Sequence, residues 1–161
     1  MLPDRKAGRF AMTLTISSPV CGSVIALPAV PDRVFAEAIV GPGTAVDPGE
    51  TATVTAIAPI SGTLKVLKPH AYVVVTAAGQ GVLVHLGIDT VELAGRGFEL
   101  HAEAGDEVRI GDPLITWDTA PSREAGKSVI VPVILLDADA DSLSVTDAAA
   151  VSAGEPLIAM Q

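Results

Sequence analysis

The sequence is poor in aromatic residues and in positive charge. Aromatic residues make up only 3% of the 161 residues, whereas apolar residues make up 49%, so a core must be built from Val, Ile, Leu and Ala. A chain of this length suits one domain with a substantial core. The net charge is -9, which makes nucleic acid and anionic membrane surfaces poor partners. A protein partner with a basic face fits better.

Cysteine and long apolar runs are also scarce. The single cysteine, Cys21, excludes an intramolecular disulfide framework, fits a reducing compartment, and is expected to be a small buried hydrophobe rather than a reactive thiol. The longest apolar run, residues 129–136, contains Pro132 and is too short to span a bilayer. Residues 1–12 lack the apolar segment of a secretory signal and are expected to form a short flexible tail, with Met1 or Met12 as the start. We therefore expect a cytoplasmic protein without stable membrane insertion.

Turn residues are plentiful, and no segment has a sustained 3.6-residue apolar period. Fifteen Gly and twelve Pro punctuate short β-rich runs. The pattern predicts an all-β fold, an antiparallel sandwich or partly open barrel, with at most short helical turns. One such turn is expected after Thr119, capped by Ser122 and ended by Gly126. Strands are expected at two places within 13–27 and at 38–40, 44–46, 72–76, 82–84, 114–117, 129–135, 143–146 and 156–160.

Two pairs of segments echo each other. Ser18–Val24 aligns with Ala58–Leu64, and Gly111–Ile115 aligns with Gly154–Ile158. The echoes are too short for a solenoid. They predict two related β half-motifs folded against each other in one domain, residues 13–161.

The most informative stretch is residues 81–98, GVLVHLGIDTVELAGRGF. A short buried strand there ends at His85, and an upstream β-rich run begins just after His70. A loop of about four residues, 77–80, can join the two runs as a hairpin. The pairing would make the two imidazoles neighbours across the ladder.

From the residues alone, a histidine at a strand end is ordinarily a core or rim residue whose ring is satisfied locally, and that interpretation stays open. The companions of other histidine chemistries are missing: there is no nucleophile elbow, no His-Glu-x-x-His, no His-x-His and no carboxylate cluster beside the pair. Two neutral imidazoles suit phosphoryl transfer, in which one attacks phosphorus and the other donates a hydrogen bond to the phosphoryl oxygens.

Val34 and Phe35 lie in a connection broken by proline and glycine. They either plug the core or form an exposed contact surface, and the residues alone favour the plug.

The sequence resembles the glucose-type enzyme IIA of the bacterial phosphoenolpyruvate-dependent sugar phosphotransferase system, from about residue 14 to the end. The most specific match is His85-Leu86-Gly87-Ile88-Asp89-Thr90-Val91-Glu92-Leu93. Further matching pieces occur in the same order along the chain: Val30-Pro31-Asp32 with Val34-Phe35-Ala36, Ala58-Pro59 with Gly62-Thr63, His70-Ala71, Gly97-Phe98, and Gly105-Asp106 with Val108 and Gly111-Asp112.

The resemblance implies an antiparallel β-sandwich with a duplicated motif and a phosphotransferase component that needs no cofactor. His85 matches the histidine that accepts a phosphoryl group from the phosphocarrier HPr, as tele-phosphohistidine, and passes it to the IIB domain of a sugar permease. His70 matches the second histidine, which supports the phosphoryl group. Asp32 and Asp89 match acidic residues around the docking face for a basic partner. Val34 and Phe35 match its apolar part, contrary to the plug interpretation.

Other consequences of the resemblance are less specific. No metal is required, although His70 and His85 could bind zinc adventitiously or with a partner. Regulatory protein partners are expected in this family, so a regulatory binding protein of the same fold is the alternative function. The sugar stays open among glucose, N-acetylglucosamine and β-glucosides. Lys68-Pro69 stands where family members often carry Thr-Asn.

Two further classes share parts of the pattern. Biotinyl- or lipoyl-carrier modules have similar Gly-Asp turns but modify a lysine at a hairpin tip, and Lys65, Lys68 and Lys127 lack the expected flanks. A zinc peptidase of related architecture needs a His-x-His pair and an Asp ligand, and this set is absent from the sequence.

Overall fold

Short antiparallel strands form most of the molecule. The computed structural model describes residues 13–161, so the predicted tail, residues 1–12, lies outside the described residues. The strands are β1 (Leu14–Ser17), β2 (Gly22–Ile25), β3 (Gly43–Asp47), β4 (Thr53–Ile57), β5 (Gly62–Lys68), β6 (Ala71–Val75), β7 (Gly81–His85), β8 (Phe98–Leu100), β9 (Glu107–Val108), β10 (Pro113–Asp118), β11 (Val131–Leu136), β12 (Leu143–Val145), β13 (Ala150–Val151) and β14 (Pro156–Met160). The helical elements are the α-helices α2 (Arg33–Ala36) and α3 (Ala120–Glu124), and the 3-10 helices η1 (Leu27–Ala29), η2 (Thr90–Leu93) and η3 (Ala140–Ser142).

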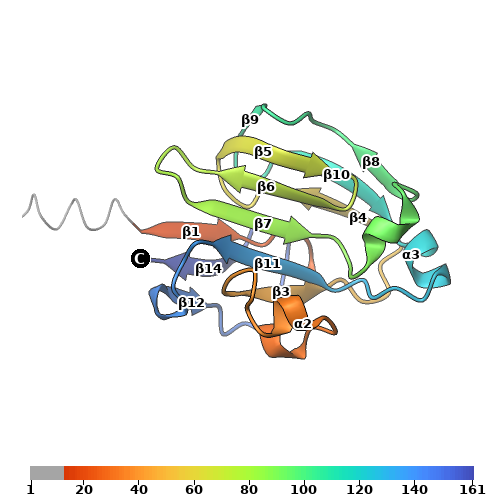
Figure 1. Ribbon diagram of the computed structural model, residues 1–161, viewed down its shortest axis with the longest axis horizontal. Coiled ribbons are helices and arrows are strands. Elements are labelled where there is room, and N and C mark those ends of the chain that lie inside the picture. Colours follow the sequence, from red (N-terminus) through yellow and green to blue (C-terminus); the bar gives the residue numbers. More distant parts are fainter. Residues whose placement is uncertain (1–12) are drawn as a thin grey trace, which may run out of the picture.

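The strands form one large and two small sheets. The eight-stranded sheet has the order β13-β2-β3-β11-β7-β6-β5-β9, and the three-stranded sheets have the orders β1-β14-β12 and β4-β10-β8. Their strand pairs are antiparallel, and Figure 1 shows β5, β6, β7 and β11 as successive strands of the large sheet. The predicted all-β antiparallel sandwich with short helical turns is confirmed.

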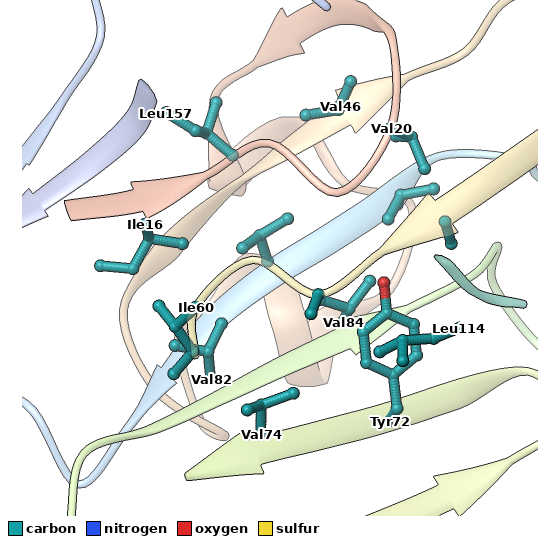
Figure 2. Close-up of a cluster of buried hydrophobic side chains, with 14 of the residues drawn as sticks. Ile16, Val20, Val46, Ile60, Tyr72, Val74, Val82, Val84, Leu114 and Leu157 are labelled. Atoms are coloured by element: carbon teal, nitrogen blue, oxygen red, sulfur yellow. The ribbon is translucent and has the colours of Figure 1, made fainter. Parts of the chain in front are cut away.

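The main core consists mostly of aliphatic side chains enclosed between the sheets, as the scarcity of aromatic residues predicts, with Tyr72 and Trp117 as its aromatic members. Figure 2 shows side chains of β6 and β7, among them Val74 and Val84, facing others from distant strands. Tyr72 is fully buried in this cluster, and its hydroxyl donates to the carbonyl of Ile57 at 2.8 Å. A buried phenol needs such a partner, so this bond removes the cost of placing it in the core.

A smaller cluster covers the opposite face of the large sheet. Phe35 of α2, Leu27 of η1 and Ile134 of β11 all belong to this cluster. Figure 1 shows α2 in front of β3, next to β11. The outward face of these strands is therefore covered by the 27–36 connection.

The two sequence echoes occupy related positions. In one half, Ser18 N–H donates to the Glu155 carbonyl at 2.7 Å and Gly154 N–H donates to the Ser18 carbonyl at 2.9 Å. In the other half, Ala58 makes the same pair of bonds with Asp112 at 2.8 Å and Gly111 at 2.9 Å. The aligned residues of the echoes thus make equivalent contacts.

The sheets repeat the same relation. The large sheet can be read from either edge, with β13, β2, β3 and β11 corresponding to β9, β5, β6 and β7. The small sheets correspond as β1-β14-β12 and β4-β10-β8. The fold is therefore built from two similar halves that meet where β7 pairs with β11.

Three detailed expectations were wrong. Residues 38–40 are not a strand, because Asp32 caps α2 by accepting from Val34 N–H at 2.8 Å and the chain then turns through Ala38 at φ 56°. Ser122 does not cap α3. It lies inside the helix, buried, where its hydroxyl accepts from Trp117 Nε1 at 3.3 Å.

Cys21 is exposed rather than buried, because it lies in the turn between β1 and β2. Its sulfur accepts from Ala153 N–H at 3.2 Å.

Among residues 13–161, no helix is long and apolar enough to cross a membrane.

Candidate functional site

His70 and His85, the two histidines of the predicted site, meet at one end of the β5-β6-β7 meander. A two-residue turn, Pro69-His70, joins β5 to β6, and His85 is the last residue of β7. Ala71 pairs with His85, and Leu86 N–H donates to the His70 carbonyl at 2.7 Å. The expected hairpin is confirmed, with a loop of residues 76–80 instead of 77–80.

The two imidazoles are in contact. Their ring centroids are 5.1 Å apart with an interplanar angle of 72°, and the Phe35 ring lies 5.2 Å from His85 at 57°. His85 is therefore bordered by a second imidazole and by an aromatic ring. The remaining imidazole edge is the place where a reacting group can approach.

A backbone oxygen fixes the protonation of His85. His85 Nδ1 lies 2.6 Å from the carbonyl oxygen of Gly87. A carbonyl only accepts, so Nδ1 carries the proton and the lone pair of the neutral ring is on Nε2. The ring thus presents an unprotonated nitrogen away from the loop that holds it.

The loop that follows β7 is held by its own bonds. Thr90 Oγ1 donates to the Leu86 carbonyl at 2.6 Å, and Ile88 N–H donates to the Ser128 carbonyl at 3.0 Å. Gly87 has φ 82°, a left-handed backbone that glycine adopts without steric cost. A Cβ at this position would lie 2.6 Å from Thr90 Cγ2 and 2.8 Å from the Ser128 carbonyl. Glycine is therefore required for both conformation and space.

Both imidazoles are held in the neutral form. Burial lowers the pKa of His85 below 6.5, against the opposing effects of the Gly87 hydrogen bond and of the Asp32 and Asp89 charges. Burial also lowers the pKa of His70, and the His85 and Lys68 charges lower it further. Near neutral pH both rings keep a lone pair and one N–H.

The related half of the fold has no histidine at these places. There Pro42 and Ile134 occupy the positions of His70 and His85: Gly43 pairs with Ile134, and Leu135 N–H donates to the Pro42 carbonyl at 2.8 Å. Ile134 belongs to the small core cluster. One half thus uses this sheet position for packing, while the other half places an imidazole pair there.

The four residues expected at a docking face differ in exposure. Phe35 is only 8% exposed and Val34 is 45% exposed, so the two neighbours divide the packing and surface roles between them. Asp32 is half-buried as the cap of α2, and Asp89 is exposed with φ 60°. Both carboxylates are close enough to His85 to act on its pKa.

Two exposed apolar residues were missed by the sequence reasoning. Ile39 is 66% exposed and follows α2, with its N–H donating to the Val34 carbonyl at 3.0 Å. Val91 is 60% exposed on η2, two residues after Asp89. The sequence could have indicated both residues, because they are large and apolar and lie in connections that flank the histidine segment. The Gly87 carbonyl was also missed, and no side-chain pattern predicts a backbone acceptor.

The third histidine, His101, does not add to the site. His101 is exposed on the surface, with Nε2 2.6 Å from Thr116 Oγ1. Within residues 13–161 no group of three or more His, Cys, Asp or Glu side chains is placed to hold a metal ion.

Fold and site together define an antiparallel β-sandwich of two similar halves, one of which carries a contacting histidine pair. Residues 14–140 match the family model described as phosphoenolpyruvate-dependent sugar phosphotransferase system, EIIA 1. The chain is 37% identical over 153 residues to the glucose-specific EIIA component of Staphylococcus epidermidis, covering 93% of this chain and 90% of that protein. It is 38% identical over 128 residues to the one from Oceanobacillus iheyensis, covering 78% and 76%.

A solved structure agrees. The glucose permease IIA from Mycoplasma capricolum superposes with a TM-score of 0.86 at 32% identity, covering 94% of this chain and 98% of that one. The chain belongs to the EIIA type 1 family of the phosphoenolpyruvate-dependent sugar phosphotransferase system, and is thus a phosphotransfer component of that system. This membership separates it from the carrier-module and zinc-peptidase classes.

Proposed function

We propose that His85 accepts a phosphoryl group from HPr on Nε2 and passes it to the IIB domain of a glucose-type sugar permease. The observation that carries this proposal is the 2.6 Å contact of His85 Nδ1 with the Gly87 carbonyl, beside His70. With the Nδ1 proton held by a backbone oxygen, Nε2 is the nucleophilic nitrogen.

The transfer asks for little rearrangement of the protein. The Nε2 lone pair forms the bond to phosphorus as the bond between phosphorus and the donor's leaving atom breaks, and its electron pair stays with the donor. The Nδ1 proton remains on the ring, which becomes cationic. The Gly87 carbonyl, whose hydrogen bond favours protonated His85, also favours the cationic ring that the transfer produces.

His70 suits a supporting role. Its imidazole is neutral near neutral pH and can donate one N–H to a phosphoryl oxygen on the neighbouring ring. Phosphoryl transfer depends mainly on positioning and charge stabilisation, so one well-placed donor contributes substantially. The apolar rings and side chains beside His85 limit water access to the phosphorylated nitrogen.

The surface around the site favours a protein as donor and acceptor. Val34, Ile39 and Val91 expose apolar side chains on the elements that flank His85, and Asp32 and Asp89 add negative charge. A modest apolar patch with acidic neighbours suits a transient complex with a basic partner. The same surface could serve regulatory partners, so regulatory binding is the second function that it supports.

The experiment that tests the proposal is phosphorylation from phosphoenolpyruvate through enzyme I and HPr, read by intact mass. Wild type is expected to gain one acid-labile phosphoryl group. His85→Gln is expected to gain none while keeping the fold, and His101→Gln is the matched control that should behave as wild type. An adduct on His85→Gln would refute the assignment, and a folded wild type without any adduct would leave only regulatory binding.

A further inference from the structure

A lysine occupies the same level of the sheet as the histidine pair. Lys68, the last residue of β5, pairs with Ala71 of β6, and Ala71 pairs with His85 of β7. Residues directly opposite each other across neighbouring strands project from the same face. Lys68 and His85 therefore project from one face of the sheet, separated by a single intervening strand.

The backbone separation between them is within reach of a long side chain. Two strand spacings of about 4.8 Å set the backbone separation, which the four-carbon stem of a lysine can largely cross. Only the methyl group of Ala71 stands on that face between them, and Ala71 itself is 7% exposed. His70 lies in the turn between Lys68 and Ala71. The ammonium charge is near enough to His70 to lower the pKa of its imidazole.

The two-residue turn that follows Lys68 is held in place by its own proline and by the ladder on both sides. Pro69 fixes its own φ, and it packs against the loop after η2, where a Cβ on Gly95 would lie 3.6 Å from Pro69 Cγ. Residues Lys68 and Ala71 on either side are paired in the ladder. The starting point of the lysine stem is therefore fixed relative to His85.

The carboxylates around His85 would repel a phosphoryl group bound to it. A phosphoryl group on His85 brings negative charge close to Asp32 and Asp89, the two carboxylates that act on this imidazole. Among residues 13–161, the ion pairs involve Arg33 with Glu37, His101 with Glu99, and Lys127 with Glu92. Lys68 is in none of these pairs and is exposed.

We infer that Lys68 is a phosphoryl-binding residue, which moves its ammonium over Ala71 to contact the phosphoryl oxygens on His85. This inference rests on the proposed function and adds a cationic ligand to the two imidazoles. An ammonium is a compact charge with three donors on a flexible stem, suited to a phosphoryl group that arrives and leaves. The contact balances the repulsion from Asp32 and Asp89 in the phosphorylated form alone.

The test compares Lys68→Gln with Lys65→Gln, a substitution of the same charge on an exposed lysine at the β5 bulge. The readouts are the equilibrium constant for phosphoryl exchange with HPr and the half-life of the phosphorylated protein. We expect Lys68→Gln to shift the equilibrium toward phosphorylated HPr by about fivefold, as for one exposed ion pair, and the shift to shrink with added salt. Lys68→Arg, which keeps the charge, should restore most of it.

The outcomes separate this inference from the proposed function. If wild type takes up the phosphoryl group and Lys68→Gln matches Lys65→Gln in both readouts, Lys68 does not bind the phosphoryl group, although His85 still accepts it. Equal losses in the two variants would likewise overturn the inference, because they would reflect net charge alone. If wild type is not phosphorylated, the proposed function itself fails.

Discussion

The loop glycine beside His85, Gly87, offers a prediction whose size follows from the structure. Gly87→Ala forces an L-residue to adopt φ 82°, and its Cβ would lie 2.6 Å from Thr90 Cγ2 and 2.8 Å from the Ser128 carbonyl. The left-handed conformation costs about 1–2 kcal/mol. Overpacking a site with little freedom to relax adds about 1–3 kcal/mol. The free energy of unfolding should therefore fall by about 2–5 kcal/mol.

A second glycine separates the two causes. Gly79, in the loop between β6 and β7, has φ 96°, and its Cβ would meet nothing within 4 Å. Gly79→Ala should therefore show only the conformational cost of about 1–2 kcal/mol. Urea unfolding of the two variants gives the difference, which measures the contact with Thr90 and the Ser128 carbonyl.

Gly87→Ala should also slow phosphoryl acceptance by His85. Relief of the clash moves the Gly87 carbonyl away from His85 Nδ1, so the ring loses the contact that fixes its proton and orientation. A displacement of this kind costs on the order of 10²-fold in rate. Acceptance from phosphorylated HPr should fall by that factor in folded Gly87→Ala and stay near wild type in Gly79→Ala. Equal stabilities and equal acceptance rates for the two variants would refute the role given to Gly87.

Three further predictions concern the surrounding groups. His70→Gln should lower transfer to IIB on the order of 10²–10³-fold and acceptance from HPr less, measured as separate half-reactions; wild-type rates in both would assign His70 to packing alone. The double variant Asp32→Asn, Asp89→Asn removes both charges, while asparagine can still cap α2 at position 32 and tolerate φ 60° at position 89. Association with HPr should therefore slow, and the rate of acceptance should depend less on salt. An unchanged rate at low salt would place both carboxylates outside the interface. Burial lowers the pKa of His85, so the rate of acceptance should be constant near neutral pH and fall to half its maximum below pH 6.5. The stability that comes from the neutral ring should be lost as pH falls from 6.5 through the lower pKa of the folded state. A half-maximal rate at or above pH 6.5 would contradict this.

Much of the fold could be predicted because its causes are local. The aliphatic composition, the frequent turns and the two echoes indicated a duplicated β-sandwich, and the contacts of Ser18 and Ala58 make the duplication concrete. The pairing of His70 with His85 could be predicted because a short hairpin leaves few possible registers. The pairing of neighbouring strands thus allowed the histidine pair of the site to be predicted from the sequence.

Features that depend on distant packing or on backbone direction could not be predicted. The four residues of α2 are too few for a helical period, although Asp32 carried a capping signal that was missed. The burial of Phe35 depends on Leu27 and Ile134, which the fold brings together from far apart in the chain. The Nδ1 contact depends on a carbonyl whose direction is set by the left-handed backbone of Gly87.

Nuclear magnetic resonance of the ring nitrogens in the phosphorylated, nitrogen-labelled protein tests the proposed chemistry most directly. The contact of His85 Nδ1 with the Gly87 carbonyl predicts phosphorus bonded to Nε2 of His85, with the proton retained on Nδ1. Phosphorus on Nδ1 of His85, or on His70 or His101, would contradict it.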